Sequence, residues 1–169
     1  ALRITVPGNN GGLMLPYFSP EIVPKVSEPS VVRQDLNEAD AKANIRAVIE
    51  AQALSSSIHA RWMGVDISSL YVTGGASANA EILRVYADVH NCPVHRFETA
   101  NSAALGAALR AAHGHQSATG NAVSWQETVA PFTKPVAGST IKPDKDAVAV
   151  YREMIIEYEA LEKAHTVAN

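Results

Sequence analysis

Hydrophobic patterns of the helical and the strand type alternate along the middle of the chain, and this alternation restricts the fold more than any other feature. The expected elements are helices over 38–63, 82–89 and 102–113 and strands over 70–73 and 94–97. Gly64 and Gly114 stand where the first and third helices are expected to end. Helix, strand, helix, strand, helix is the order of a layered α/β domain.

The segments on either side of this core carry different signals. A turn rich in Gly and Asn, 7–12, leads into a short apolar strand over 13–15, which Pro16 is expected to stop. Three further prolines follow before residue 30 and exclude a regular helix or a central strand there. The range 116–146 mixes Pro, Gly, Ser and Thr and predicts a surface loop, and a final amphipathic helix follows it.

Composition limits the class of protein. The chain has 169 residues, of which 47% are hydrophobic and 18% charged, so residues 1–169 are expected to form one domain around one core. A net charge of -3 without a run of Lys or Arg argues against nucleic acid or anionic lipid as a partner. No apolar stretch reaches the roughly 20 residues of a membrane span. Because Cys92 is the single cysteine, the chain has no internal disulfide, which favours a cytoplasmic location. Cys92 itself is expected to be a small core residue.

The strongest local signal is the segment 73–79, Thr-Gly-Gly-Ala-Ser-Ala-Asn, between an expected strand and an expected helix. Two glycines let the backbone turn sharply and let a flat ligand come close. The free N–H groups at the start of the next helix suit a phosphate or a polar ring edge. The same pattern also fits a simple turn, with Ser77 as the N-cap of the helix. The residues alone leave both interpretations open.

The other candidate residues give weaker evidence of a functional site. The small residues of 99–108 permit close approach to a ligand, but they also fit simple helix packing. His113 and His115 have no partner cluster and are interpreted as surface residues rather than metal ligands. Acidic residues of the helices are interpreted as solvated; they are Glu38, Asp40, Glu153, Glu157, Glu159 and Glu162. No Ser-His-Asp order, phosphate-binding P-loop or paired-carboxylate motif is present.

Several segments together resemble a known family. They are Tyr71–Asn79, Glu81–Leu83, Ala87–Val89, Pro93–Val94, Thr99–Ala103, Gly106, Arg110–Ala111, Pro7–Gly11, Glu21–Pro24 and Arg46–Gln52. In this order they resemble the FGGY carbohydrate kinases and, within that family, the eukaryotic branch that phosphorylates xylulose. The extension Thr-Ala-Asn-Ser after the second strand favours this branch over glycerol and gluconate kinases.

The resemblance implies an α/β fold of the actin-like, ribonuclease-H-like type, with this chain as the C-terminal lobe of a sugar kinase. It implies that Gly74, Gly75, Ala76 and Asn79 contact the adenosine part of ATP, with Ser77 as a structural cap. The implied reaction transfers the γ-phosphoryl of Mg²⁺-ATP to D-xylulose. The implied partner is the N-terminal lobe of the same enzyme, and a homodimer is left open.

The resemblance places the catalytic Asp base and the sugar contacts upstream of residue 1, so no catalytic residue and no metal ligand is expected in this chain. We therefore expect the 169 residues alone to be inactive as a kinase. Ala51, and Leu13–Leu15 after Gly12, depart from the family pattern and weaken the substrate assignment. Two alternatives remain open: a related kinase for another sugar or polyol, and a non-catalytic actin-like ATP-binding module.

Overall fold

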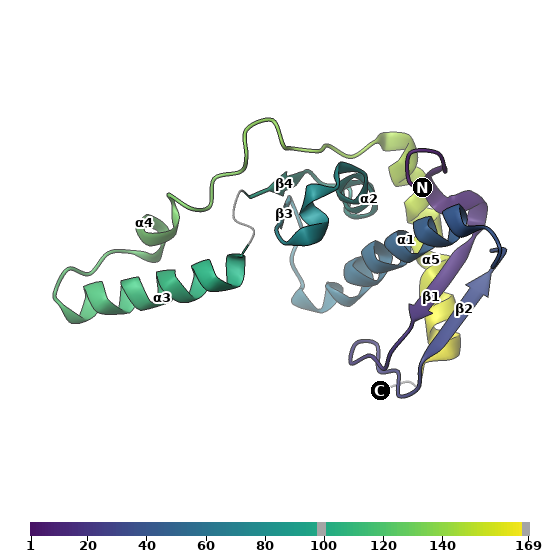
Figure 1. Cartoon of the computed structure of the whole chain (residues 1–169), viewed down its shortest axis with the longest axis horizontal. Helices are drawn as coiled ribbons and strands as arrows, with labels where there is room; N and C mark the ends of the chain where they lie inside the picture. Colours follow the sequence, from purple (N-terminus) through teal and green to yellow (C-terminus); the bar gives the residue numbers. More distant parts are fainter. Residues whose placement is uncertain (98–100, 167–169) are drawn as a thin grey trace.

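The computed structural model describes residues 1–97 and 101–166 (Figure 1). Its strands are β1 (Leu13–Tyr17), β2 (Ser30–Gln34), β3 (Leu70–Val72) and β4 (Val94–Arg96). Its α-helices are α1 (Ala41–His59), α2 (Ala80–His90), α3 (Ser102–Ala118), α4 (Trp125–Val129) and α5 (Lys145–His165). Short 3₁₀ turns are η1 (Pro7–Gly11), η2 (Arg61–Met63) and η3 (Gly75–Ala78). The expected alternation of helices and strands between residues 38 and 113 is confirmed.

The main core lies between the β1–β2 hairpin and the two long helices. Strands β1 and β2 pair antiparallel with Leu15 opposite Val32, and α1 and α5 pack against them (Figure 1). The largest fully buried side chains include Tyr151 and Tyr158 of α5 and Leu54 of α1. Buried residues at helical spacing along α5 pack with those of the hairpin and α1, so the three elements share one hydrophobic core.

A second, smaller core lies under the parallel pair β3–β4. Leu70 is opposite Val94, and Val94 also bridges to Ile141 on its other side. Leu83 and Ala87 of α2 cover this pair. Strand β3 therefore leads directly into the turn before α2, which is the segment 73–79 discussed above.

Side chains fix where the helices begin and end. The carboxylate of Asp40 accepts hydrogen bonds from two N–H groups at the start of α1, and Asp144 does the same for α5. Gly64 is left-handed, but it follows η2 rather than α1, which ends at His59, so the expectation that Gly64 ends the first helix is wrong. Among the described residues, no helix is both long and apolar enough to cross a membrane.

Three further local features differ from what the sequence predicts. Pro16 does not stop β1 but lies inside it opposite Val31, because each strand of a two-stranded ribbon has a free edge that tolerates proline. Strand β2, directly after Pro29, was not expected. Gly114 does not end α3, which continues to Ala118; because no residue of α3 is buried, no apolar pattern marks its end.

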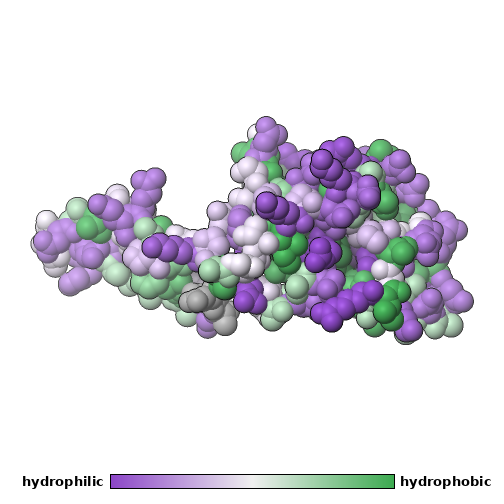
Figure 2. Space-filling model, turned by 90° about the horizontal axis from the view of Figure 1, so that it is seen from above, coloured by the Kyte–Doolittle hydropathy of each residue, from purple (hydrophilic) through white to green (hydrophobic). Residues whose placement is uncertain are grey.

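Helices α3 and α4 form an arm that projects from the main body, as Figures 1 and 2 show from two directions. No residue of α3 is buried. The range 116–146, expected to be a surface loop, contains α4 with its Ser124–Glu127 capping box, and its ends lie in α3 and α5. Between these helices its residues are mostly exposed.

Candidate functional site

The turn between β3 and α2 is an open, backbone-rich surface. Gly74 has φ 87° and ψ -175°, a conformation that residues with a Cβ rarely adopt. A Cβ placed on Gly74 or Gly75 would meet no heavy atom of the described residues within 4 Å. All residues from Thr73 to Ala76 are exposed. The turn can therefore receive a ligand directly on its backbone.

Asn79, and not Ser77, is the N-cap of α2. The Oδ1 atom of Asn79 accepts hydrogen bonds from Glu81 N at 3.0 Å and Ile82 N at 3.4 Å. The Ser77 hydroxyl instead donates to the Gly74 carbonyl oxygen at 2.6 Å, which closes η3. The interpretation of Ser77 as the helix cap is therefore wrong, because η3 separates Ser77 from the start of α2.

A hollow of about 300 Å³ adjoins Asn79. Its apolar lining comes from Ile45 and Ile49 of α1, from Ile82 of α2 and from Ala1 and Leu2. Its polar rim consists of Asn79 together with the ion pair between Arg3 Nε and Glu81 Oε1, at 3.2 Å. A hollow lined mostly by apolar side chains with a few polar groups is the usual form of a small-molecule or cofactor site.

A buried polar cluster holds the loop 7–12 against α1 and α5. Oε1 of Glu50 accepts from Gly8 N at 2.9 Å, from Arg46 Nη1 at 2.9 Å and from the Tyr151 hydroxyl at 2.7 Å. Nη2 of Arg46 donates to the carbonyl oxygens of Leu2 and Thr5. Glu50 has no exposed surface. The cluster connects three segments that are far apart in the sequence.

Burial raises the pKa of Glu50, and the hydrogen bonds from Tyr151 and Arg46 and the Arg46 charge oppose this shift. The sequence contained one signal for the pair, since Arg46 and Glu50 lie four residues apart on an expected helix. That spacing does not separate a buried pair from a solvated one, so the cluster was not predicted.

The sequence model for the C-terminal domain of the FGGY family of carbohydrate kinases matches residues 3–115. This range contains the hairpin, α1, the Gly74–Gly75 turn and α2. The chain belongs to the FGGY family of carbohydrate kinases. Residues 3–115 therefore correspond to the C-terminal domain of such a kinase.

The curated FGGY relatives are named as kinases of different sugars. The chain is 36% identical to the xylulose kinase of Mus musculus over 169 residues, which cover 96% of this chain and 30% of the mouse protein. It is 38% identical to xylulose kinase 2 of Arabidopsis thaliana over 130 residues, 67% of this chain and 23% of the plant protein. It is also 35% identical to the ribulokinase of Bacillus licheniformis over 120 residues, 69% of this chain and 22% of that protein. The chain thus spans less than a third of the length of these relatives.

Solved structures show the same fold. A ligand-bound xylulose kinase from Lactobacillus acidophilus has a TM-score of 0.78 at 19% identity, over 96% of this chain and 33% of that one. Plasmodium falciparum glycerol kinase with ADP has a TM-score of 0.67 at 16% identity, over 95% and 32% of the two chains. These FGGY sugar kinases have the actin-like ATPase fold. The fold class expected from the resemblance is confirmed.

The other candidate residues identified in the sequence of this FGGY chain do not lie in the turn between β3 and α2. In the run 99–108, Thr99 and Ala100 lie outside the described residues, and Asn101 caps α3 by accepting from Ala104 N at 3.0 Å. The ring of His113 stacks on Trp125, with centroids 4.1 Å apart. Among residues 1–97 and 101–166, no group of three or more His, Cys, Asp or Glu side chains could hold a metal ion.

Two expectations about single side chains are now resolved. Cys92 is buried, as expected of a small core residue. Glu162 was interpreted as solvated, which is wrong, because it is 5% exposed and bonded to Tyr17 and His59. Helical periodicity placed Glu162 beside Leu161 at the edge of the buried stripe, where a side chain can face either way.

Proposed function

We propose that this chain is the nucleotide-binding C-terminal lobe of an ATP-dependent kinase that phosphorylates D-xylulose to D-xylulose 5-phosphate. The observation that carries the proposal is the match to the FGGY C-terminal domain over residues 3–115, together with 36% identity to the mouse xylulose kinase. The reaction requires the further length that the relatives possess, with the Asp base and the sugar contacts. We place the enzyme in the cytoplasm.

Within this lobe we assign the adenosine part of ATP to Gly74, Gly75, Ala76 and Asn79. Two features of the geometry support the assignment: the exposed backbone of the turn and the apolar hollow beside Asn79. The heterocycle would enter the hollow between Ile45 and Ile49 of α1 and Ile82 of α2. The backbone of the glycine turn would then lie against the ribose without a Cβ in the way.

The chemistry of Asn79 defines its part in binding. Both hydrogen bonds that hold α2 go to Oδ1, so the amide Nδ2 is the group that can face a ligand. Asn79 would therefore donate to an acceptor nitrogen of the base. Among the described residues, no group of three or more His, Cys, Asp or Glu side chains could hold Mg²⁺.

The first experiment measures phosphorylation of D-xylulose, D-ribulose, glycerol and gluconate by the longer enzyme that contains this chain. A strong preference for D-xylulose is expected. A preference for ribulose or glycerol would reassign the substrate to a related FGGY kinase, which the ribulokinase similarity makes the second candidate. Absence of turnover on all four, with ATP still bound, would favour the non-catalytic ATP-binding module.

Asn79 variants separate helix capping from ligand binding. Asn79→Asp keeps a capping oxygen but loses the amide donor, so we expect unchanged stability and an ATP KM raised about 3–10-fold, as for one lost hydrogen bond. Asn79→Ala loses both groups and should also lower stability by about 1 kcal/mol. Steady-state kinetics and thermal unfolding measure the two effects.

The matched control is Asn101→Asp, the same replacement at the N-cap of α3. It should leave the ATP KM unchanged. An Asn79→Asp enzyme with the KM of the wild type would remove Asn79 from the adenosine site.

A further inference from the structure

The parallel pair β3–β4 has one covered and one open outer edge. On the outer edge of β4, Val94 exchanges two backbone hydrogen bonds with Ile141, both at 2.9 Å. The carbonyl oxygen of Arg96 accepts a further bond from Val136 N at 2.8 Å. The connection between α4 and α5 therefore covers the edge of β4. On the outer edge of β3, none of the described residues forms a strand or a bridge.

The open edge presents the backbone groups of Tyr71. Leu70 N donates to Pro93 O at 2.9 Å. The carbonyl oxygen of Val72 accepts from Phe97 N at 3.3 Å. Successive residues of a strand direct their N–H and C=O groups alternately to its two sides. Because Leu70 and Val72 face β4, the N–H and C=O groups of Tyr71 point away from β4, where a further strand can pair with them.

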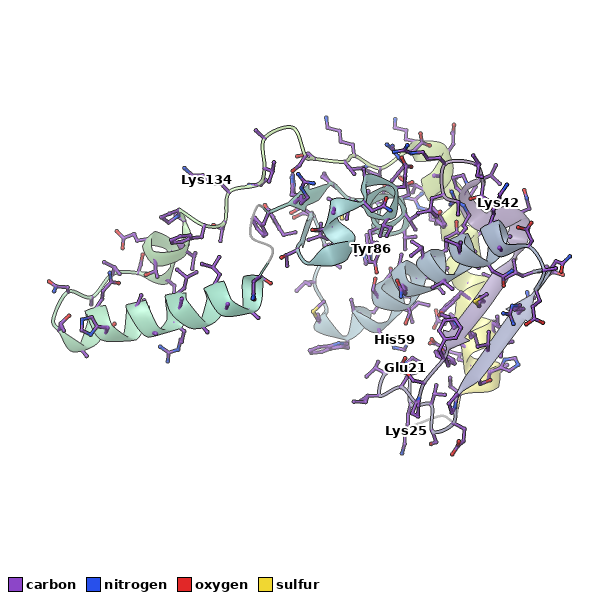
Figure 3. All side chains as sticks on the ribbon, in the orientation of Figure 1. Glu21, Lys25, Lys42, His59, Tyr86 and Lys134 are labelled. Atoms are coloured by element: carbon purple, nitrogen blue, oxygen red, sulfur yellow. The ribbon has the colours of Figure 1, made fainter. Side chains whose placement is uncertain are left out.

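The two faces of the β3–β4 pair also differ. Helix α2 covers one face, and Tyr86 of this helix packs against both hydrophobic clusters of the molecule (Figure 3). The other face carries Tyr71, whose ring stacks on His95 and Phe97 with centroids 5.0 and 5.2 Å apart. Tyr71 is nevertheless 53% exposed. Parallel sheets occur almost only with both faces covered, so this small sheet has the form of a part of a larger one.

We propose that the open edge of β3 is the docking surface for a β-strand of the longer FGGY enzyme, from the part that is N-terminal to this chain. Curated relatives supply the length for this partner, since the chain spans 30% of the mouse xylulose kinase. The match is to a C-terminal domain, so most of the remaining length precedes it. The inference rests on family membership and not on the sugar or on the nucleotide site.

A second copy of the chain is the competing partner, because open strand edges can pair with each other. Strand β3 has only three residues, so pairing between two copies would add few hydrogen bonds. Association of separate molecules also costs translational and rotational freedom. A strand of the same polypeptide avoids most of this cost, because the connecting chain keeps it at a high effective concentration. The short edge therefore favours a strand of the same enzyme.

The first test compares amide hydrogen exchange at Tyr71 in the longer enzyme and in the 169-residue chain. We expect exchange at least about tenfold slower in the longer enzyme, because a docked strand accepts a hydrogen bond from this N–H. In the chain alone, exchange should not depend on protein concentration. Equal exchange in the two proteins would overturn the proposal. Protection in the chain that rises with its concentration would also overturn it and assign the edge to a second copy.

Two variants of Tyr71 provide the second test. Tyr71→Pro and Tyr71→Val both remove the ring, but only proline removes the N–H at the open edge. Proline is tolerated at an edge whose N–H faces solvent, so the two variants of the 169-residue chain should have similar melting temperatures. In the longer enzyme, Tyr71→Pro should melt at least about 4 °C below Tyr71→Val. The same difference between the variants in both proteins would contradict the docking of a strand.

Discussion

We expect Glu50→Ala to lower the free energy of unfolding by about 3–5 kcal/mol, the largest stability effect of any single replacement considered for this chain. Alanine leaves the guanidinium of Arg46, which is 4% exposed, without its carboxylate. It also leaves Gly8 N and the Tyr151 hydroxyl without their acceptor. Urea unfolding followed by circular dichroism measures the change.

Tyr151→Phe is the matched control, because it removes one donor to Glu50 and a long hydrogen bond from Arg46 Nη1, at 3.4 Å, but leaves the ion pair intact. Its expected cost is about 1 kcal/mol, the usual net contribution of a hydrogen bond. The account requires Glu50→Ala to cost clearly more than Tyr151→Phe. A Glu50→Ala chain within about 1 kcal/mol of the wild type would show that the loop 7–12 is held by other contacts.

The second large effect distinguishes the two glycines of the turn. Gly74→Ala forces a Cβ into φ 87°, ψ -175°, which should cost about 1–3 kcal/mol and distort the turn. Gly75 does not have a positive φ, and a Cβ there meets nothing within 4 Å. Gly75→Ala should therefore change stability by less than about 0.5 kcal/mol.

We expect Gly75→Ala to weaken nucleotide binding strongly, although it hardly changes stability. The added methyl group projects from an exposed turn that the nucleotide must approach closely, so the ADP affinity of Gly75→Ala should fall about tenfold or more while its fold is intact, a loss of about 1.4 kcal/mol. Calorimetric titration with ADP measures this. Wild-type affinity in Gly75→Ala would argue that the nucleotide does not contact this backbone.

Periodicity predicted the elements whose burial follows a regular pattern. Helices α1, α2 and α5 bury one face each, so their apolar residues recur at helical spacing, and strand β3 alternates between half-buried and exposed residues. Strand β2 escaped prediction because it follows Pro29 and is only partly buried. The end of α3 escaped because none of its residues is buried, so no apolar pattern marks where it stops.

The position of the turn was predicted from the sequence, but its detailed structure was not. The Gly-Gly pair between a strand and a helix identified the turn, because positive φ has a residue-type signature. The cap was assigned to Ser77 because the sequence does not show that η3 separates it from α2. The hollow between Ile45, Ile49 and Ile82 joins helices distant in sequence, and the burial of Glu50 and Glu162 depends on tertiary contacts. No local pattern carries such information.

The most direct test of the central claim is an amide NMR titration of the chain with ADP, with AMP and ribose 5-phosphate as comparison ligands. The account predicts saturable shifts that centre on residues 74–82 and extend to Ile45 and Ile49, with AMP shifting the same residues and ribose 5-phosphate leaving the isoleucines unaffected. ADP shifts that centre elsewhere, or an absence of saturable binding, would contradict the assignment of this lobe as the nucleotide-binding side of a sugar kinase.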